Sequence, residues 1–432
     1  MQMVIHLALK VLGSFLYCKS KSKSKSDWEI ALHNLRRISA SDIYDVLKIS
    51  YDELEWDVKN IFLDIACFFK GDDEDRVISV FDDHDLMHYG LDILVEKSLI
   101  TRSNNKLEMH DLLQEMGQKI VYEESPEEPG KRSRLWHHKD VYDVLRKNKG
   151  TNSIRSISLN LSGIGDAYLR LESNVFVNMD NLKYLKFYMS SFGSGLDYLR
   201  SSRSKVHLSQ GLDYLPEELR YLHWDGCPLE TLPKNFTPKN LTGLHLSCGE
   251  IEKIEDFYEE KELPKLKFIE LLGFDYLSSI PADPSKTPNM ERIILSHCQR
   301  LSRVPLSIQN FNKLGLLRLI GCRSLSCFPP DIKFGYPIKI EISFCGLREF
   351  PPISGEVIEL DLHCTDIEEV DSSISRLTSL EKLSIINCHR LKSISTNICK
   401  LKSLLWFELM VCSNLGRFPE ILEQMESYYI FI

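Results

Sequence analysis

The sequence predicts an α+β protein built from two dissimilar parts. Apolar residues recur at helical spacing through most of the first third of the chain, where one alternating stretch predicts a two-stranded hairpin. From residue 154 onward, short strand patterns return at a regular period. The length of 432 residues also exceeds what a single compact core usually serves, which favours more than one structural unit.

Composition narrows the possible classes of protein. The chain is 43% hydrophobic and 27% charged, which is typical of a soluble globular protein. Its net charge of −9 argues against a protein whose main task is to bind nucleic acid. No segment reaches the ~18 consecutive apolar residues that a membrane span needs. His6 and Lys10 interrupt the apolar N-terminus and no cleavage site follows, so a secretory signal is not favoured.

The next stretch alternates lysine and serine between Cys18 and Ser26. A solvated connector is the expected role of this tract, and a basic localisation or nucleic-acid signal is the alternative. Ser26 and Glu29 have the spacing of a capping box, which predicts the start of a helix that runs to Ile38. The tract is therefore expected to join two helices.

Helical patterns then precede the hairpin. Their apolar residues are Ile43, Val46 and Leu47; Leu54, Val58, Ile61, Phe62, Ile65, Phe68 and Phe69; Val77 and Phe81; Leu91, Leu94 and Val95. The stretch SLITRSNNKLEMHD alternates on both sides of Asn104 and Asn105, as a hairpin should. A further helix runs from Asp111 to Val121. Helices followed by a β-ribbon predict a winged-helix unit over residues 39–125.

A winged helix often binds DNA, but the charges of this one are unsuitable. The ribbon offers only Arg102 and Lys106 as basic groups. The helices before it carry many carboxylates that would repel a duplex: Asp72, Asp73, Glu74, Asp75, Asp82, Asp83 and Asp85. Nucleic acid is therefore not an expected partner.

His110 and Asp111 stand where the ribbon ends and the last helix begins. Asp111 and Gln114 have the spacing of a capping box, so Asp111 is expected to cap that helix. No H-x-x-x-H or C-x-x-C spacing accompanies the pair, so neither a metal site nor an enzyme is expected. A histidine held at a helix N-terminus is well placed to contact an anionic group.

Several short motifs follow one another through the first third of the chain. They are ALKVLG (8–13), LKISYDEL (47–54), IFLDIACFF (61–69), KSLI (97–100), MHDLLQEMG (109–117) and GKRSRLW (130–136). Together they resemble the NB-ARC region of plant intracellular immune receptors of the TIR-NB-LRR class. In that family the histidine of the Met-His-Asp motif contacts the β-phosphate of ADP and holds the receptor off. The resemblance gives this role to His110, with Asp111 steadying the motif, and makes residues 1–38 the end of the preceding helical subdomain.

The chain also departs from the family. Where the family has GLPLAL, with a proline that touches the nucleotide, Val4, Ile5 and His6 replace the first three residues. There is no G-x-x-x-x-G-K-[ST] loop to hold phosphates, and no TIR domain. We therefore expect a truncated receptor. ADP and ATP are the cofactors of the family, and this chain is not expected to bind either one tightly.

The second part of the chain consists of repeats. Their pattern is L-x-x-L-x-L-x-x-C-x-x-L-x-x-[L/I/F]-P, and 24 residues separate Cys298 from Cys322 and Cys388 from Cys412. These are leucine-rich repeats, in which stacked strands form one curved sheet. They are assigned to residues 154–425, after a linker at 126–153. The tail at 426–432 is expected to leave the last repeat exposed, with a fold-back of Tyr429, Ile430 and Phe431 as the alternative.

The cysteines fall into the repeat pattern. They occupy one interior slot of successive repeats: Cys227, Cys298, Cys322, Cys345, Cys388 and Cys412. Buried thiols, not disulfides, are expected there, which suits a cytoplasmic protein, with the nucleus as a second possible location. An extracellular repeat receptor is the rival interpretation, because Asn160, Asn235 and Asn240 begin glycosylation sequons.

The outward-facing strand positions are the candidates for binding a partner. They are Tyr221, His223, His245, Phe268, Glu270, Arg292, Arg318, Lys339, Glu341, Glu359, Asp361, Lys382, Trp406 and Glu408. We expect this concave face to recognise a pathogen effector or a host protein. The alternatives are a decoy or regulatory fragment that associates with intact receptors, and a product without function.

Overall fold

The computed structural model describes residues 7, 9–14, 17, 43–81, 83–190, 205–208, 210–258, 261–280, 282–416 and 429–431. The Lys-Ser tract and the expected capping box at Ser26 lie outside these residues. The chain forms two compact units. Unit 1 comprises Met1–Leu159 and Asn178–Leu185, and unit 2 comprises Asn160–Val177 and Lys186–Ile432.

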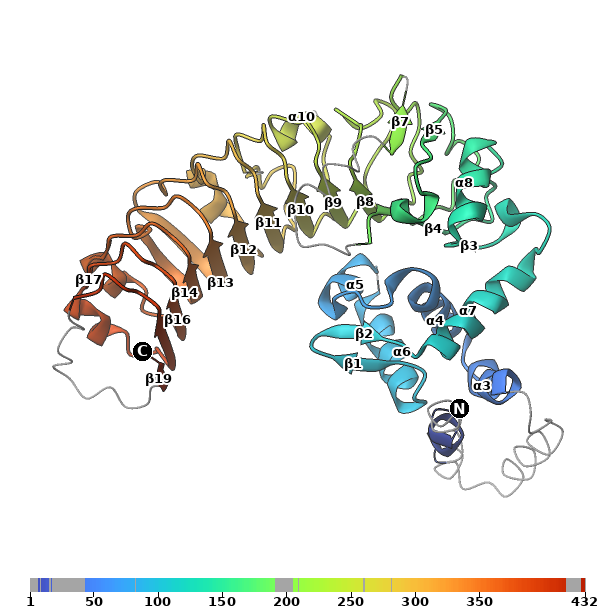
Figure 1. Ribbon diagram of the computed structural model, residues 1–432, viewed down its shortest axis with the longest axis horizontal. Coiled ribbons are helices and arrows are strands. Elements are labelled where there is room, and N and C mark those ends of the chain that lie inside the picture. Colours follow the sequence, from blue (N-terminus) through green and yellow to red (C-terminus); the bar gives the residue numbers. More distant parts are fainter. Residues whose placement is uncertain are drawn as a thin grey trace. The chain divides into compact units, whose positions relative to one another are not determined.

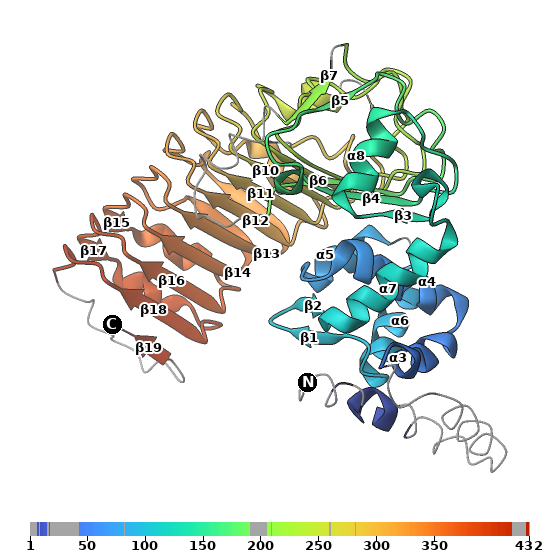
Figure 2. The ribbon, with the colours of Figure 1, turned by 45° about the vertical axis from the view of Figure 1, so that its right-hand side comes forward.

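Unit 1 is a helical bundle with a small ribbon, as Figure 2 shows. Between residues 43 and 124, its helices are α3 (Ile43–Asp52), α4 (Trp56–Asp64), η1 (Ile65–Phe69), α5 (Glu74–Val80), α6 (His84–Glu96) and α7 (Asp111–Glu124). All five residues of η1, a π-helical turn, are buried. Gly117 of α7 allows a close approach to η1, because a Cβ built there would lie 2.6 Å from the Cβ of Ala66.

The ribbon consists of β1 (Thr101–Ser103) and β2 (Lys106–Glu108), which pair in antiparallel fashion. Asn104 and Asn105 connect them with φ angles of 50° and 60°. Two successive left-handed residues make the turn that matches the twist of a hairpin, and asparagine tolerates this conformation well. The expected hairpin and its turn are thus confirmed.

The stretch 126–153, expected to be a linker, is folded. It contains η2 (Pro129–Lys131), β3 (Arg134–Leu135) and α8 (His138–Arg146). Strand β3 pairs in parallel with β4 (Ser156–Asn160). Helix α8 buries Val141, Val144 and Leu145, which recur at helical spacing. An apolar helical face of this kind needs a packing partner, so the stretch is an ordered part of the structure.

Unit 2 contains a long sheet of parallel strands. The segment that joins each strand to the next returns along the side of the repeat that faces away from the sheet (Figure 1). From β8 onward its strands are β8 (Tyr221–Asp225), β9 (Gly243–Ser247), β10 (Phe268–Leu272), β11 (Arg292–Ser296), β12 (Leu316–Ile320), β13 (Ile332–Ser343), β14 (Ile353–His363), β16 (Lys382–Ile386), β18 (Trp406–Met410) and β19 (Tyr429–Phe431). The connections contain α10 (Ile254–Tyr258), η5 (Leu306–Asn310), η6 (Ser372–Arg376), η7 (Thr396–Lys400), and the pair β15 (Glu369–Val370) and β17 (Ser393–Ile394).

The earlier part of the repeat region contains shorter elements. They are η3 (Leu161–Ile164), β5 (Leu169–Leu171), β6 (Tyr184–Tyr188) and β7 (Val206–Leu208). At the other end, β19 pairs in parallel with β18. The expectation that the last repeat stays exposed is therefore wrong for the edge of β18, and the fold-back alternative describes the backbone. The unpaired N–H and C=O groups of an edge strand favour such pairing.

The alternation along each strand separates the core from the outward face. Leu317 and Leu319 of β12 are fully buried, whereas the Arg318 side chain between them is about one-third exposed. The expected register of the repeats is thus confirmed. Immediately after each strand of the long sheet from β8 to β18, which leaves out β15 and β17 of the connections, one residue adopts the left-handed conformation: Gly226, Cys248, Gly273, His297, Gly321, Phe344, Cys364, Asn387 and Val411.

Every described cysteine is a free thiol, as the repeat pattern predicts. Cys298 and Cys322 are fully buried. The Sγ atom of Cys322 lies 3.8 Å from the carbonyl oxygen of Leu295 in the preceding repeat and 3.6 Å from that of Ile320 in its own. Cys345 and Cys388 repeat this arrangement. Among the described residues, no helix has both the length and the apolar content to cross a bilayer.

Candidate functional site

His110 caps helix α7, a role that the sequence pattern assigned to Asp111. The backbone N–H of Leu112 donates a hydrogen bond to Nδ1 of His110, at 3.2 Å. An imidazole nitrogen that accepts a hydrogen bond carries no proton, so neutral His110 keeps its proton on Nε2. That nitrogen can then donate to an anionic group.

Asp111 has a different role, because a distant lysine binds it. Its Oδ1 accepts a hydrogen bond from Nζ of Lys70 at 2.6 Å, and Oε1 of Gln114 accepts another from the same Nζ at 2.8 Å. The hydrogen bond from Lys70 and its positive charge lower the pKa of Asp111. The Asp111 side chain is 85% exposed, so solvent screens most of this attraction.

A cavity of about 530 Å³ lies beside the cap, within unit 1. Its walls include Leu99, Met109 and Leu113, together with His110 and Lys10. The cavity combines a mainly apolar lining with an imidazole and an ammonium group. This arrangement can hold a flat apolar group and contact a negative charge, which is the chemistry that a nucleotide requires.

The candidate residues of unit 2 lie in two straight rows across the sheet. Strand pairing aligns His223, His245, Glu270, Ile294, Arg318, Glu341, Asp361, Ser384 and Glu408 in one row. The same pairing aligns Tyr221, Gly243, Phe268, Arg292, Leu316, Lys339, Glu359, Lys382 and Trp406 in the other. The predicted alignment of these positions is confirmed, and their role in binding a partner stays a prediction.

Tyr221 and Phe268 are corrections to the expected outward face. Only 1% of Tyr221 and none of Phe268 is accessible to solvent. Gly243 stands between them in the row and has no side chain, so the ring of Phe268 fills the space above it. The rings of Tyr221 and Phe268 lie 5.9 Å apart. These two aromatic residues are therefore part of the packing and cannot contact a partner directly.

The charged candidates pair with one another across neighbouring strands. Arg318 forms a two-fold ion pair with Glu341, in which Nη2 lies 2.9 Å from Oε1. Lys339 pairs with Glu359 at 2.6 Å. Lys382 pairs with Asp361 at 3.3 Å. This face thus presents a largely neutralised network of charges, not an acidic patch.

Sequence reasoning missed Asp225, which is 4% exposed and adjoins two of the candidate histidines. Its carboxylate lies near the imidazoles of His223 and His245. The signal was present in the sequence, because His223 and Asp225 are two residues apart and side chains at that spacing share one face of a strand. His245 adjoins them through strand pairing.

Comparisons with known proteins find that this chain is similar in sequence to disease resistance proteins. Residues 55–125 match the family described as the winged-helix domain of Roq1-like disease resistance proteins. The disease resistance-like protein DSC1 of Arabidopsis thaliana is 39% identical over 99% of this chain and 35% of its own length. The TMV resistance protein N of Nicotiana glutinosa is 33% identical over 98% of this chain and 35% of its own. The disease resistance protein RPV1 of Vitis rotundifolia is 40% identical over 71% and 22%.

The fold is a winged-helix domain followed by leucine-rich repeats, and the sequence is similar to plant disease resistance proteins along almost the whole chain. Its winged helix matches the Roq1-like family over residues 55–125. The resemblance seen in the sequence motifs is thereby confirmed. The chain spans about a third of the length of DSC1 and of the TMV resistance protein N.

Proposed function

We propose that this chain supplies the recognition and regulatory parts of a plant immune receptor that acts in the cytoplasm or nucleus. In this function the repeats bind a pathogen or host protein, and the winged helix conveys the event to the rest of the receptor. One observation supports the proposal above all: a continuous sheet with in-register rows of polar side chains belongs to the same chain as a Roq1-like winged helix. The function is one of binding, without catalysis.

The ion pairs of the sheet indicate how recognition works. A partner that met unpaired buried charges would have to compensate them at a high cost in desolvation. Here Arg318 and Glu341 already form an ion pair with each other. A partner therefore has to complement only the arrangement of these paired charges on the strand face. Charge patterns of this kind contribute more to specificity than to raw affinity.

Reversal of paired charges tests this surface without unpairing it. The double variant Arg318→Glu with Glu341→Arg preserves the ion pair and inverts the pattern that a partner meets. A two-hybrid screen with the whole wild-type chain first selects proteins that bind it. These proteins should no longer bind the reversed variant. The measurement is the affinity of each purified binder for both proteins.

The matched control is a second reversal away from the strands. Lys392 and Glu368 form an ion pair at 2.6 Å in the connecting segments of the repeats. All the selected proteins should still bind the variant Lys392→Glu with Glu368→Lys. If both reversals act alike, or if neither weakens any binder, the strand face is not the recognition surface.

We also infer that the cavity beside His110 forms one wall of an adenine nucleotide site, as the family resemblance implies. The proposal is supported by the apolar lining and by the tautomer that the helix cap imposes on His110. A single charge-assisted hydrogen bond contributes about 1.5–3 kcal/mol, and loss of freedom on binding offsets much of this gain. The chain alone should therefore bind ADP weakly and should not hydrolyse ATP. Calorimetry that finds submicromolar ADP affinity would contradict this expectation.

Two substitutions separate the cap from the nucleotide contact. His110→Ser keeps an oxygen that can cap α7, whereas His110→Ala removes both the cap and the imidazole. In a receptor of full length that carries this region, both variants should weaken the off state and raise cell death without a pathogen. If only His110→Ala does so, the histidine acts through helix stability and not through the nucleotide.

Nucleic acid remains an unsuitable partner in this proposal. Arg102, the arginine of the ribbon, pairs with Glu74 and with Asp92, each at 2.8 Å. An arginine that is already paired has less charge to offer a phosphate backbone. A shift assay with duplex DNA should show no complex at physiological salt.

A further inference from the structure

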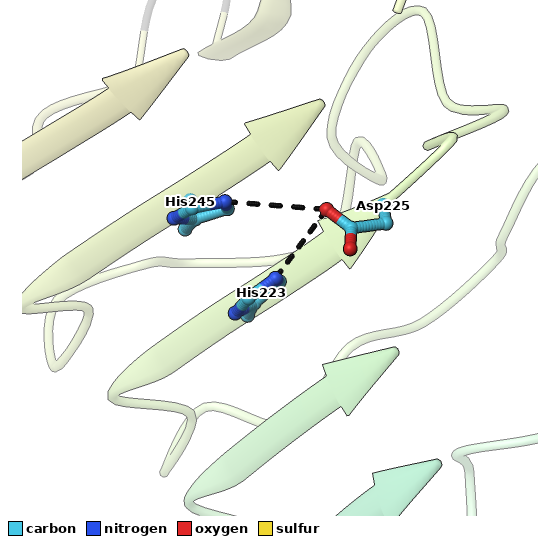
Figure 3. A group of neighbouring side chains, drawn as sticks. All are labelled: His223, Asp225 and His245. Carbon is cyan, nitrogen blue, oxygen red and sulfur yellow. Dashed lines mark ion pairs between the residues drawn. The ribbon is translucent and has the colours of Figure 1, made fainter. Parts of the chain in front are cut away.

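Three side chains of unit 2, from β8 and β9, lie close together, as Figure 3 shows. His223 and Asp225 share one face of β8, and strand pairing sets His245 beside His223. Nε2 of His223 lies 3.4 Å from Oδ1 of Asp225, and Nε2 of His245 lies 4.0 Å from the same oxygen. The three candidate ligand atoms all lie within 4.8 Å of one another.

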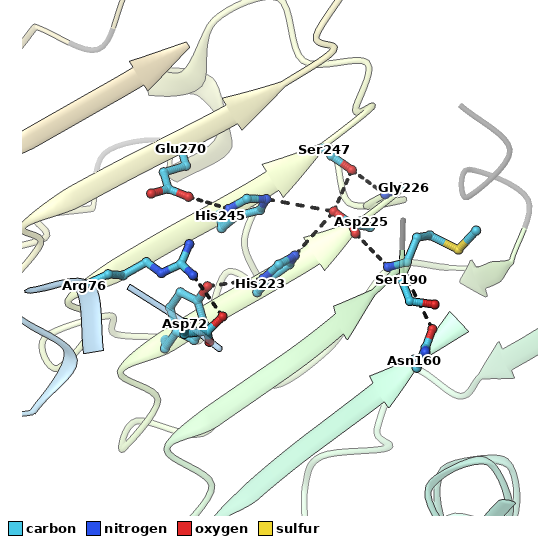
Figure 4. Close-up of polar contacts among 12 residues, drawn as sticks. Asp72, Arg76, Asn160, Ser190, His223, Asp225, Gly226, His245, Ser247 and Glu270 are labelled. Carbon is cyan, nitrogen blue, oxygen red and sulfur yellow. Dashed lines mark hydrogen bonds and ion pairs between the residues drawn. The ribbon is translucent and has the colours of Figure 1, made fainter. Parts of the chain in front are cut away.

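Neighbouring groups orient both imidazoles toward this point (Figure 4). Nδ1 of His245 lies 2.6 Å from Oε2 of Glu270. A carboxylate only accepts, so this nitrogen carries a proton, and Nε2 is the nitrogen of His245 that could bind a metal. Nδ1 of His223 is 3.2 Å from the hydroxyl of Tyr221. A histidine with its other nitrogen bound to a carboxylate is the usual arrangement at a metal.

Asp225 is held just as firmly. Oδ1 accepts a hydrogen bond from Oγ of Ser247 at 2.9 Å, and Oδ2 accepts one from the backbone N–H of Met189 at 2.9 Å. These two hydrogen bonds fix the direction in which the carboxylate faces the imidazoles of His223 and His245.

One nitrogen of the cluster is unsatisfied. Nε2 of His223 is buried and makes no hydrogen bond, although it lies near Asp225. A buried polar atom without a partner is unfavourable, and a bound cation would supply that partner.

We propose that His223, Asp225 and His245 bind one divalent transition-metal ion, with Zn²⁺ as the best match. Two imidazoles and one carboxylate suit zinc or iron, whereas Ca²⁺ and Mg²⁺ prefer oxygen ligands. Bonds of about 2.0–2.1 Å in a tetrahedron place neighbouring ligand atoms about 3.3–3.4 Å apart. The distance between His223 and Asp225 already fits. The two imidazole rings stack with centroids 3.9 Å apart and an interplanar angle of 24°, so the rings have to turn away from this stacking for both Nε2 atoms to face one ion.

The site would have an open coordination position. Three protein ligands leave the fourth position of a zinc ion to water or to a side chain of a bound protein. The side chains of His223 and His245 are 12% and 17% exposed, although Nε2 of His223 itself is buried. The inference concerns metal binding and does not depend on the immune function proposed above.

The test is zinc binding by the full chain, free of affinity tags and previously treated with chelator. Calorimetry should find a site for Zn²⁺ that Ca²⁺ and Mg²⁺ do not fill, and Fe²⁺ measured without oxygen should bind more weakly. Asp225→Asn and His245→Gln should each weaken Zn²⁺ binding more than about 100-fold. Glu270→Gln, which changes only the partner of His245, should weaken it about 10–100-fold. His363→Gln, at the end of another strand, should change nothing.

The free thiols of the chain require a second readout. Co²⁺ bound by nitrogen and oxygen gives visible bands without the near-ultraviolet charge transfer that thiolates produce. Wild-type protein should show the visible bands alone, and His245→Gln should lose them while its circular dichroism spectrum stays native. A thiolate spectrum, tighter binding of Fe²⁺ than Zn²⁺, or equal Zn²⁺ affinity in wild type and variants would overturn the proposal. Equal affinity would mean that the three side chains form only hydrogen bonds and ion pairs with one another and bind no metal.

Discussion

Arg134 and Asp64, 70 residues apart in the chain, form a buried ion pair in unit 1, with Nε of Arg134 2.7 Å from Oδ1 of Asp64. Their side chains are 2% and 10% exposed. Nη2 of Arg134 also donates to the backbone carbonyl of Asn60, at 3.1 Å. The pair fastens β3 to α4, which explains why the GKRSRLW motif needs an arginine at this position.

Loss of Arg134 should strongly destabilise unit 1. Arg134→Ala leaves the carboxylate of Asp64 buried without a partner, which costs about 3–5 kcal/mol. Denaturant unfolding, followed by hydrogen exchange in α4, measures the loss. Lys147→Ala is the control, because Lys147 and Asp143 form an exposed pair on α8 that contributes about 0–1 kcal/mol. Equal effects of the two substitutions would mean that the buried pair is not an anchor.

The core of the repeats should be far more sensitive than their outward face. Leu319→Ala removes a fully buried side chain and should cost about 2–5 kcal/mol. Arg318→Ala removes a partly exposed ion pair and should cost about 0–1 kcal/mol. Thermal melts of the two variants compare them directly. If Arg318→Ala lowered the stability more than Leu319→Ala, the assignment of buried and exposed positions in β12 would be wrong.

Gly243 should not tolerate even a methyl group. A Cβ at this position would lie 2.1 Å from Cζ of Phe268, so the buried ring would have to move. Gly243→Ala should therefore destabilise the repeats by about 1–3 kcal/mol, as overpacking does. In β13, Gly335 has no atom within 4 Å of the equivalent Cβ, so Gly335→Ala should lie within about 0.5 kcal/mol of wild type. Chemical denaturation of both variants distinguishes these outcomes.

Stability at alkaline pH should depend on Tyr51. Burial raises the pKa of Tyr51 to about 12, although the charge of Arg134 opposes the shift. An unfolded tyrosine ionises near 10, so above this pH the unfolded state releases a proton that the folded state retains. The contribution is complete below about pH 10 and is lost as the pH rises toward 12. Tyr51→Phe should flatten the fall in unfolding free energy between about pH 10 and 12, and an unchanged slope would assign that fall to other groups.

The register of the repeats could be read from the sequence because each repeat carries its own signals. The alternation around Arg318 and the position of Cys322 recur at a fixed distance, so each repeat checks the assignment of the others. The hairpin was equally local, since Asn104 and Asn105 define its turn without help from the rest of the chain. Patterns that depend on neighbours in sequence were thus predictable.

Features that depend on contacts across the chain were not. Asp111 fits a capping box, but Lys70 lies 41 residues away and binds it, leaving His110 to cap the helix. Phe268 has an outward-facing position, but a glycine on the adjacent strand lets the ring sink into the packing. The spacing of residues within one repeat does not show that the neighbouring repeat has a glycine, and therefore no side chain, at the paired position.

The stacked thiols of Cys322, Cys345 and Cys388 have a consequence for how such a chain can change its length. The thiol of Cys322 contacts one carbonyl of its own repeat and one of the repeat before it, and Cys345 and Cys388 do the same. A gene duplication that inserts one whole repeat supplies a new thiol and a new carbonyl together, so every contact at both junctions is recreated. An insertion of half a repeat would set apolar residues on the outward face and leave the thiols without their carbonyls. Growth and shrinkage by whole repeats is therefore the route by which relatives of this protein can vary the reach of the sheet without rebuilding its core.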